Sequence, residues 1–294
     1  MGEHRGGPGA VRLASIAMTA SIPTATLANG VEMPALGLGT SPMGERQAEE
    51  IVAAALRDGY RLIDTAENYR NEAGVGRGIR ASGVDRDEVF VTTKFNERWH
   101  GEAEARQAFA NSAERLGLAR IDLLLIHWPV PAKDRYVDAW KGLLSLLEDG
   151  SLRAIGVSNF KPVHLDRLLE ETGVAPHVNQ IELDPTHSRP EARAYHAAHG
   201  IVTESWSPIG AGGGLLAHPA IVDLSRRRSK TPAQVVLRWH VQLGLVPIPR
   251  TTKADRLSEN RDVFDFELSA AEMEELADLD RADDGVMDSD RFGH

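Results

Sequence analysis

The sequence predicts an α/β fold in which eight parallel strands close into a (β/α)8 barrel, with an N-terminal β-hairpin as a cap. Short apolar segments alternate with longer segments of helical periodicity, and this alternation occurs eight times along the chain. Eight repeats favour closure into a barrel over an open doubly wound sheet. The expected strands are 35–39, 62–64, 89–94, 123–127, 154–158, 178–181, 201–205 and 245–248.

Helices are expected between these strands because apolar residues recur there at spacings of three and four. The clearest stripe includes Tyr136, Trp140 and Leu147. Thr231-Pro232 is typical of a helix start. Four glycines follow helical segments where a left-handed cap is expected: Gly59, Gly150, Gly173 and Gly200. Ahead of the first strand, the hairpin signal Asn29-Gly30 predicts a plug at the bottom of the barrel.

Composition narrows the class of protein. The 294 residues include 43 acidic and 33 basic side chains, for a net charge of −10, and no cysteine. The lack of cysteine excludes a disulfide scaffold and a thiol nucleophile, and the acidic balance argues against a nucleic-acid partner. No apolar segment approaches the roughly 18 residues of a membrane span. We expect a cytoplasmic protein with a disordered leader at 1–20, one barrel domain at 21–280 and a loose polar tail at 281–294.

Three consecutive predicted strands end in an ionisable residue. Asp64, Lys94 and His127 each follow an apolar segment, and Tyr69 comes five residues after Asp64. Each alone has an ordinary explanation, as a helix cap, a surface lysine, a structural histidine or a packing tyrosine. Because the C-terminal ends of barrel strands converge on one mouth, we expect all four side chains to lie together.

Such a group suits acid catalysis at a carbonyl. The ammonium of Lys94 would favour the phenolate of Tyr69 and lower its pKa from about 10. Asp64 would keep Lys94 charged and in place, and a neutral His127 can donate a hydrogen bond to a carbonyl oxygen. These groups protonate an oxygen when hydride reaches the carbonyl carbon, so the chemistry points to a nicotinamide cofactor.

Seven motifs in order resemble those of the aldo-keto reductase superfamily. They are DTAENYRNEAGVG, VTTK, LIHWP, IGVSNF, VNQIE, ESWSP and the segment 250–260, within a match over about 24–280. The segments YVDAW, TPAQVVLRWH and ENRDVFDFELS are most similar to the prokaryotic 2,5-diketo-D-gluconate reductase-like group. The resemblance implies a monomer that reduces small aldehydes or ketones, keto-sugars and diketones among them, with NADP(H). It makes Tyr69 the general acid, Asp64 and Lys94 its tuning partners, and His127 the carbonyl-orienting residue.

The resemblance also assigns residues to the nicotinamide half of NADP(H). Ser158, Asn159 and Gln180 would hydrogen-bond the carboxamide. Trp206 would stack on the ring, where the family usually has Tyr. A glycine-rich loop after the seventh strand would fold over the pyrophosphate. Six further residues are expected to bind the cofactor: Gly39 and Thr40 at the end of the first strand, and Ser207, Pro208, Ile209 and Gly210 after the seventh.

The residues that bind the other half of the cofactor can be inferred from their charge. Arg250, Thr251 and Thr252 precede a helix that carries Arg256. Hydroxyls and free amides at a helix N-terminus, with two guanidinium groups, suit a 2′-phosphate. We therefore expect NADPH to be preferred over NADH. By resemblance, Glu259 and Asn260 would contact the adenine.

The substrate pocket is expected to draw on loops after the strands. The candidate lining residues are Trp128, Phe95, Trp99 and Met43. His196 and His199 are three residues apart on a helix, but without a third ligand in view they are expected on a solvated face, and no metal site is predicted.

Three other functions use the same residues. A Schiff-base aldolase would use Lys94 as its nucleophile, but the cofactor segment at 250–260 argues against it. A metal-dependent hydrolase would use Asp64 and His127, but that class expects His-x-His at the first strand, where Gly37-Leu38-Gly39 stands. A cofactor-binding regulator with little turnover is disfavoured by the complete catalytic group.

Overall fold

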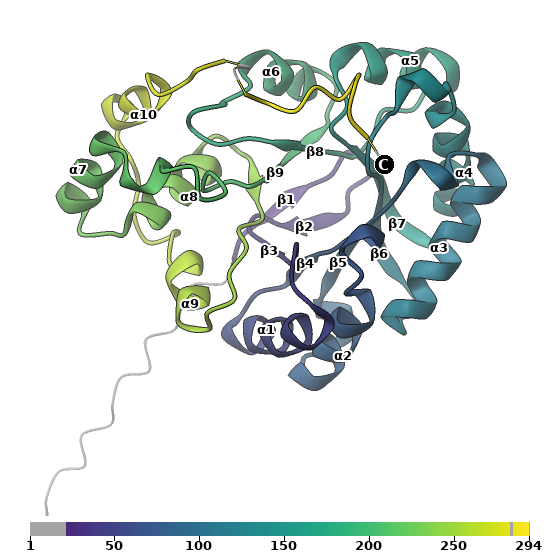
Figure 1. Cartoon of the computed structure of the whole chain (residues 1–294), viewed down its shortest axis with the longest axis horizontal. Coiled ribbons are helices and arrows are strands. Elements are labelled where there is room, and N and C mark those ends of the chain that lie inside the picture. The colour runs from purple at the N-terminus through teal and green to yellow at the C-terminus, as the bar shows by residue number, and fades with distance from the viewer. Residues whose placement is uncertain (1–21, 283–284, 294) are drawn as a thin grey trace, which may run out of the picture.

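Eight parallel strands form one sheet, in the order β3 to β10, in a computed structural model that describes residues 22–282 and 285–293 (Figure 1). Two backbone hydrogen bonds, from Gly37 to Pro247 at 3.0 Å and from Gly39 to Pro249 at 3.2 Å, join the outer strands. The sheet therefore closes into the predicted barrel. The strands are β3 (Leu38–Gly39), β4 (Leu62–Asp64), β5 (Phe90–Phe95), β6 (Ile121–Ile126), β7 (Leu152–Ser158), β8 (Val178–Glu182), β9 (Val202–Trp206) and β10 (Val246–Pro247).

Helices surround the strands (Figure 1). Their inner faces carry the apolar stripes read from the sequence, and in the helix that begins at Tyr136 the side chains of Trp140 and Leu143 are fully buried. Among the helices of the described residues, none combines the length and the apolar character needed to cross a membrane. The helices are α1 (Glu45–Asp58), α2 (Glu72–Ser82), α3 (Glu102–Leu116), α4 (Tyr136–Glu148), α5 (Pro162–Thr172), α6 (Pro190–Ala198), α7 (Pro219–Arg228), α8 (Pro232–Gln242), α9 (Asp255–Arg261) and α10 (Ala270–Ala277).

The predicted helix signals are confirmed. All four cap glycines have positive φ, and Gly59, with φ 109°, closes α1 in the left-handed conformation. Thr231 and Gln234 form a reciprocal capping box at the start of α8. Within α2, a Cβ on Gly76 would lie 1.8 Å from the carbonyl oxygen of Leu116, so only glycine lets α2 approach α3 this closely.

The N-terminal hairpin forms as expected and seals one end of the barrel. Strands β1 (Thr24–Thr26) and β2 (Glu32–Pro34) pair antiparallel, and Gly30 takes the left-handed position of the turn with φ 80°. Leu27 and Met33 from this hairpin pack against side chains of the barrel interior. They close the bottom of the barrel, so the site must open at the other end.

Inside the barrel, an apolar floor lies beneath a polar layer. The floor is made by Leu62, Phe90, Leu123, Leu125, Ala154, Val178, Val246 and Ile248. Because alternate residues of a strand face the same side, the positions two residues beyond Leu62 and Val178 also face inward. Those positions are Asp64 and Gln180, and Lys94 follows Phe90 by four residues. The strand period therefore places polar side chains in one layer near the open end.

The C-terminal tail was expected to be loose, but the structure ties it to the barrel. The ammonium of Lys161 lies 2.6 Å from carboxylate oxygens of both Asp288 and Asp290. The ring of Phe292 packs edge-on against Trp128, with ring centroids 4.8 Å apart. These contacts bring the chain end across the open end of the barrel (Figure 1).

One further expectation from the sequence is wrong. His196 is fully buried and not solvated, because its face of α6 packs on the sheet. Its Nε2 lies 2.9 Å from Asn179 Nδ2 and its Nδ1 lies 2.8 Å from Thr203 Oγ1. Burial lowers the pKa of His196 to about 4, so the ring is neutral. His199 is partly buried and stacks on Tyr195 at 4.1 Å.

Candidate active site

A buried ion pair forms the centre of the polar layer. Asp64 ends β4 and Lys94 lies in β5, and both side chains are buried. Lys94 Nζ donates to Asp64 Oδ1 at 2.8 Å, to Oδ2 at 2.7 Å and to the carbonyl oxygen of Thr65 at 3.0 Å. All three hydrogen bonds suit an ammonium, and both oxygens of Asp64 act as acceptors, as a carboxylate requires.

Tyr69 and His127 join this pair, as the sequence predicts. Tyr69 ends a short 3-10 helix, Glu67–Tyr69, that turns the chain back over β4. Its hydroxyl lies 3.4 Å from Lys94 Nζ. The ring of His127, directly after β6, lies edge-on to the Tyr69 ring with centroids 6.0 Å apart. Four residues from three strand ends therefore meet at one place.

The electrostatics differ from the sequence-based expectation at Tyr69. Burial alone would lower the pKa of Lys94, but the Asp64 carboxylate raises it above its usual value. At Tyr69, burial raises the pKa and outweighs the lowering effect of the Lys94 ammonium. The predicted fall in the Tyr69 pKa is therefore wrong for the protein alone. Tyr69 keeps its proton at neutral pH, which is the form that a general acid needs.

A second buried carboxyl, which the sequence-based expectations did not include, lies in this layer. Glu204 lies in β9 beside Gln180 of β8, and its side chain is fully buried. Gln180 Nε2 donates to Glu204 Oε2 at 2.7 Å and to Asp64 Oδ2 at 2.9 Å. Burial raises the pKa of Glu204 to about 8. The signal was available, since an acidic residue stands inside the apolar segment 201–205.

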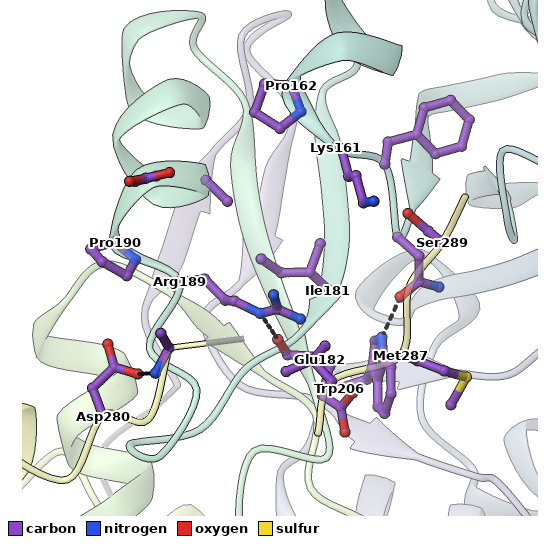
Figure 2. A pocket seen from close by; sticks show the side chains of 16 residues that line it. Lys161, Pro162, Ile181, Glu182, Arg189, Pro190, Trp206, Asp280, Met287 and Ser289 are labelled. Atoms are coloured by element: carbon purple, nitrogen blue, oxygen red, sulfur yellow. Dashed lines mark hydrogen bonds between the residues drawn. The ribbon is translucent and has the colours of Figure 1, made fainter. Parts of the chain in front are cut away.

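The residues expected around the nicotinamide also lie together. Ser158 Oγ donates to the carbonyl oxygen of Gln180 at 2.9 Å. Asn159 has a left-handed backbone, with φ 64°, and its Nδ2 donates to the carbonyl oxygen of His127 at 3.1 Å. Trp206 Nε1 donates to Asn159 Oδ1 at 2.9 Å (Figure 2). These hydrogen bonds connect the predicted ring-stacking residue to His127 of the predicted catalytic group.

Residues at the closure of the barrel, where β3 meets β10, help to hold the polar layer in place. Thr40 is buried, and its Oγ1 donates to the carbonyl oxygen of Asp64 at 2.9 Å. A Cβ on Gly39 would lie 2.8 Å from the carbonyl oxygen of Ile248, so glycine is needed where the barrel closes. Gly39 and Thr40 therefore have a structural role in placing Asp64, whatever they contact in a ligand.

A separate cavity of about 240 Å³ collects most residues expected at the adenosine end. Neither of its two guanidinium groups, Arg250 and Arg256, has an ion-pair partner among the described residues, and both side chains are exposed. A cavity with an apolar wall and two unpaired cations fits a nucleotide that carries an extra phosphate. Thr252 does not line this cavity. The lining is Ile209, Leu216, Pro232, Ala233, Arg250, Thr251, Arg256, Glu259 and Asn260.

The loop after β9 lies between the catalytic group and this cavity. Ser207 has φ 51° and Gly210 has φ 79°, so the backbone is left-handed at two places near the start of the loop. The carbonyl oxygen of Pro208 accepts a hydrogen bond from His240 Nε2 at 3.0 Å. Burial lowers the pKa of His240 to about 4, so a neutral ring fixes the base of the loop.

Of the four residues predicted to line a substrate pocket, two lie elsewhere. Phe95 and Met43 are fully buried in the main hydrophobic core. Lys94 faces the barrel interior, so the next residue in β5, Phe95, must face the helices. Trp128 follows His127 directly and contacts the tail. Trp99 Nε1 lies 3.0 Å from both carboxylate oxygens of Glu67.

A larger cavity of about 370 Å³ has Trp206 and Asn159 in its lining (Figure 2). The rest of its lining comes from β8, from the starts of α5 and α6, and from the tail. Tyr69, Lys94 and His127 do not line it.

Comparisons with known proteins agree with this arrangement. The model of the Aldo/keto reductase family matches residues 33–281. The chain is 48% identical over 261 residues to 2,5-diketo-D-gluconic acid reductase B of Corynebacterium sp., covering 89% of this chain and 94% of that protein. It is 45% identical over 269 residues to methylglyoxal reductase DkgA of Escherichia coli K12, covering 91% and 97%.

A solved structure gives the same result. A mutant of Gox0644 in complex with NADPH has a TM-score of 0.87 and 42% identity, covering 92% of this chain and 98% of that chain. The likeness to the prokaryotic 2,5-diketo-D-gluconate reductase-like group, expected from the motifs, is confirmed by the named relatives. The chain belongs to the aldo/keto reductase family.

Proposed function

We propose that this protein is an NADPH-dependent reductase of aldehydes and ketones in which Tyr69 is the general acid. The observation that carries the proposal is the buried Lys94 Nζ, which contacts both the buried Asp64 carboxylate and the hydroxyl of the half-buried Tyr69. The relatives named for diketogluconic acid and methylglyoxal reduction, and a neighbour in complex with NADPH, support the reaction class.

The residues present at the two places fit the two halves of NADPH. Arg250, Arg256 and Thr251 would hold the 2′-phosphate, and Glu259 and Asn260 would contact the adenine in the same cavity. Ser158, Asn159 and Gln180 would hold the carboxamide, and Trp206 would lie on the nicotinamide ring. When bound, NADPH supplies the hydride that reduces the carbonyl carbon.

The chain's own residues supply the proton that the reduced carbonyl oxygen takes up. Tyr69 and His127 lie side by side, so both can donate a hydrogen bond to one carbonyl oxygen. As negative charge develops on that oxygen, Tyr69 transfers its proton, and the ammonium of Lys94 stabilises the resulting phenolate. Asp64 keeps Lys94 charged throughout, because it accepts two hydrogen bonds from the ammonium.

The same contacts argue against a Schiff-base aldolase. A nucleophilic lysine must be neutral, but the pKa of Lys94 is raised and its ammonium donates hydrogen bonds to Asp64, Thr65 and Tyr69. Reduction with borohydride in the presence of an aldol substrate should therefore leave the mass of the protein unchanged. A stable adduct on Lys94 would instead support the aldolase mechanism.

The decisive experiment follows NADPH absorbance with a panel of aldehydes, diketones and keto-sugars. The native protein should oxidise NADPH with some members of the panel, and Tyr69→Phe should lower kcat by about 10²- to 10⁴-fold, the usual contribution of a general acid. Unchanged activity in Tyr69→Phe would refute the assignment of the acid. NADPH binding without turnover on any carbonyl would favour a regulatory protein.

A further inference from the structure

Glu204 is a buried acid that takes no part in the proton transfer proposed above. Its side chain is fully buried in β9, two residues before Trp206. Oε2 has one hydrogen bond, from Gln180, and Oε1 has no partner among the described residues. A buried carboxyl oxygen without a partner costs stability. An apolar residue would fit this strand with less penalty, so the presence of Glu204 points to a function.

Two carboxyl groups share one amide nitrogen. Gln180 Nε2 lies 2.7 Å from Glu204 Oε2 and 2.9 Å from Asp64 Oδ2. A primary amide nitrogen carries two N–H bonds in one plane, so this pair of hydrogen bonds uses both of them. With one hydrogen bond the amide could still turn about that bond. With two, the plane of the amide and the direction of its oxygen are both set.

The opposite orientation of the amide is excluded by Asp64. Lys94 donates to both oxygens of Asp64, so this carboxyl is ionised and can only accept hydrogen bonds. Exchanging the nitrogen and oxygen of Gln180 would bring two acceptors into contact. Because both N–H bonds are used within the protein, the group that Gln180 can offer a ligand is its side-chain oxygen.

We propose that Glu204 is a positioning residue: together with Asp64 it sets the Gln180 amide so that the side-chain oxygen accepts a hydrogen bond from the carboxamide NH2 group of the cofactor. The inference rests on the proposed function, since it requires a nicotinamide beside Gln180. It adds that Glu204, a residue outside the expected cofactor contacts, helps to orient the amide that meets the NH2 group. Pyridine dinucleotides that lack this group should bind less well.

This role depends on a hydrogen bond and not on charge. With a pKa of about 8, Glu204 is protonated at pH 7 and accepts from Gln180 through its carbonyl oxygen. A glutamine at this position keeps a carbonyl acceptor and nearly the same shape. A leucine removes the acceptor. Glu204→Gln and Glu204→Leu both remove the titrating group, so their comparison isolates the hydrogen bond.

The test measures binding without turnover. Isothermal titration at pH 7 gives the Kd of NADP⁺ and of its acetylpyridine analogue, in which a methyl group replaces the NH2 of the carboxamide. The native protein should prefer NADP⁺. Glu204→Leu should reduce this preference about three- to tenfold, the range for one hydrogen bond, and Glu204→Gln should retain it. Ser205→Ala is the matched control, since Ser205 is the next residue, is also buried and has an unpartnered hydroxyl among the described residues.

The outcomes separate this inference from the proposed function. If Gln180→Leu abolishes the preference while Glu204→Leu leaves it intact, Glu204 has no positioning role and the proposed function stands. If Glu204→Leu and Ser205→Ala reduce the preference equally, the effect comes from disturbance of β9 and the inference is wrong. If the native protein binds neither dinucleotide, the proposed function itself fails. Thermal unfolding checks folding, and Glu204→Met replaces Glu204→Leu if the leucine variant does not fold.

Discussion

The two ends of the proposed cofactor groove are built in opposite ways. At the catalytic end, Asp64 and Lys94 are buried, and three hydrogen bonds from the ammonium fix the pair. At the adenosine end, Arg250 and Arg256 are exposed and have no ion-pair partner among the described residues. The charges of the catalytic end are paired within the protein before a ligand binds. The two guanidinium groups of the adenosine end are available to pair with a bound anion.

The difference follows from what each end does. A proton donor works best where water is excluded and its partners cannot move, because electrostatic effects are largest in a low-dielectric site. Burying charges is costly, so that end must satisfy each charge within the protein. Phosphate binding needs free cations at the surface, which remain hydrated and cost little until the anion replaces the water. Substitutions at the catalytic end should therefore lower the stability of the protein, whereas substitutions at the adenosine end should weaken cofactor binding and leave stability unchanged.

The largest effect is expected from Lys94→Met. Removing the ammonium leaves the Asp64 carboxylate buried without its main partner, which should lower the free energy of unfolding by about 3–5 kcal/mol. The loss should shrink at low pH, where Asp64 can take up a proton. Urea unfolding at pH 5 and pH 8 measures both effects. Adding Asp64→Asn should recover much of the stability, and a double variant no better than Lys94→Met would contradict this explanation.

The exposed end supplies the control for that experiment. Arg250→Met also removes a cation, but the Arg250 side chain is exposed and has no ion-pair partner in the described part of the chain. The free energy of unfolding without cofactor should change by less than about 0.5 kcal/mol. A large loss would show that Arg250 has a structural partner.

The next effect concerns pH and the catalytic end alone. The pKa of Glu204 is raised from 4.5 to about 8 by burial, so the folded protein keeps a proton that the unfolded chain releases above pH 4.5. Stability should therefore fall as pH rises from about 4.5 to 8, by up to about 1.4 kcal/mol per pH unit from this group. Glu204→Gln should remove this part of the slope. Parallel stability curves for the two proteins would contradict the burial of an acid here.

Arg256→Ala should produce the opposite pattern at the adenosine end. Loss of a charge-assisted contact to the 2′-phosphate should raise the Kd of NADPH about 10- to 100-fold, while the Kd of NADH stays the same. Fluorescence titration with both cofactors measures the change, and thermal unfolding without ligand should be unaltered. If the substitution leaves the Kd of NADPH and the Kd of NADH both unchanged, Arg256 does not bind the 2′-phosphate.

The smallest effect is expected at the tail, which belongs to neither end. Phe292 packs on Trp128, but its side chain is 41% exposed. Phe292→Ala should lower the free energy of unfolding by less than about 1 kcal/mol and make the tail easier to cleave in limited proteolysis. The Kd of NADPH should not change. A large change would place the tail in the cofactor groove.

Prediction from sequence succeeded where a residue's place follows from strand or helix periodicity. Asp64 and His127 were expected at strand ends because apolar segments stop there, and the structure brings them together with Tyr69. Phe95 shows where this reasoning failed. It is expected in a loop after its strand, but it is the last residue of β5, where the strand period of two turns its side chain toward the helices.

The sequence by itself determined the eight strands, the helix caps, the hairpin plug and the residue types available for acid catalysis, because these depend on local periodicity and turn chemistry. Tertiary structure decided which side chains are buried together, and therefore which pKa values shift and which hydrogen bonds form. Burial reversed the expected shift in the Tyr69 pKa, and closure of the barrel placed Glu204 and Asp64 on one amide of Gln180. Both results depend on contacts between strands far apart in the chain, which no local pattern specifies.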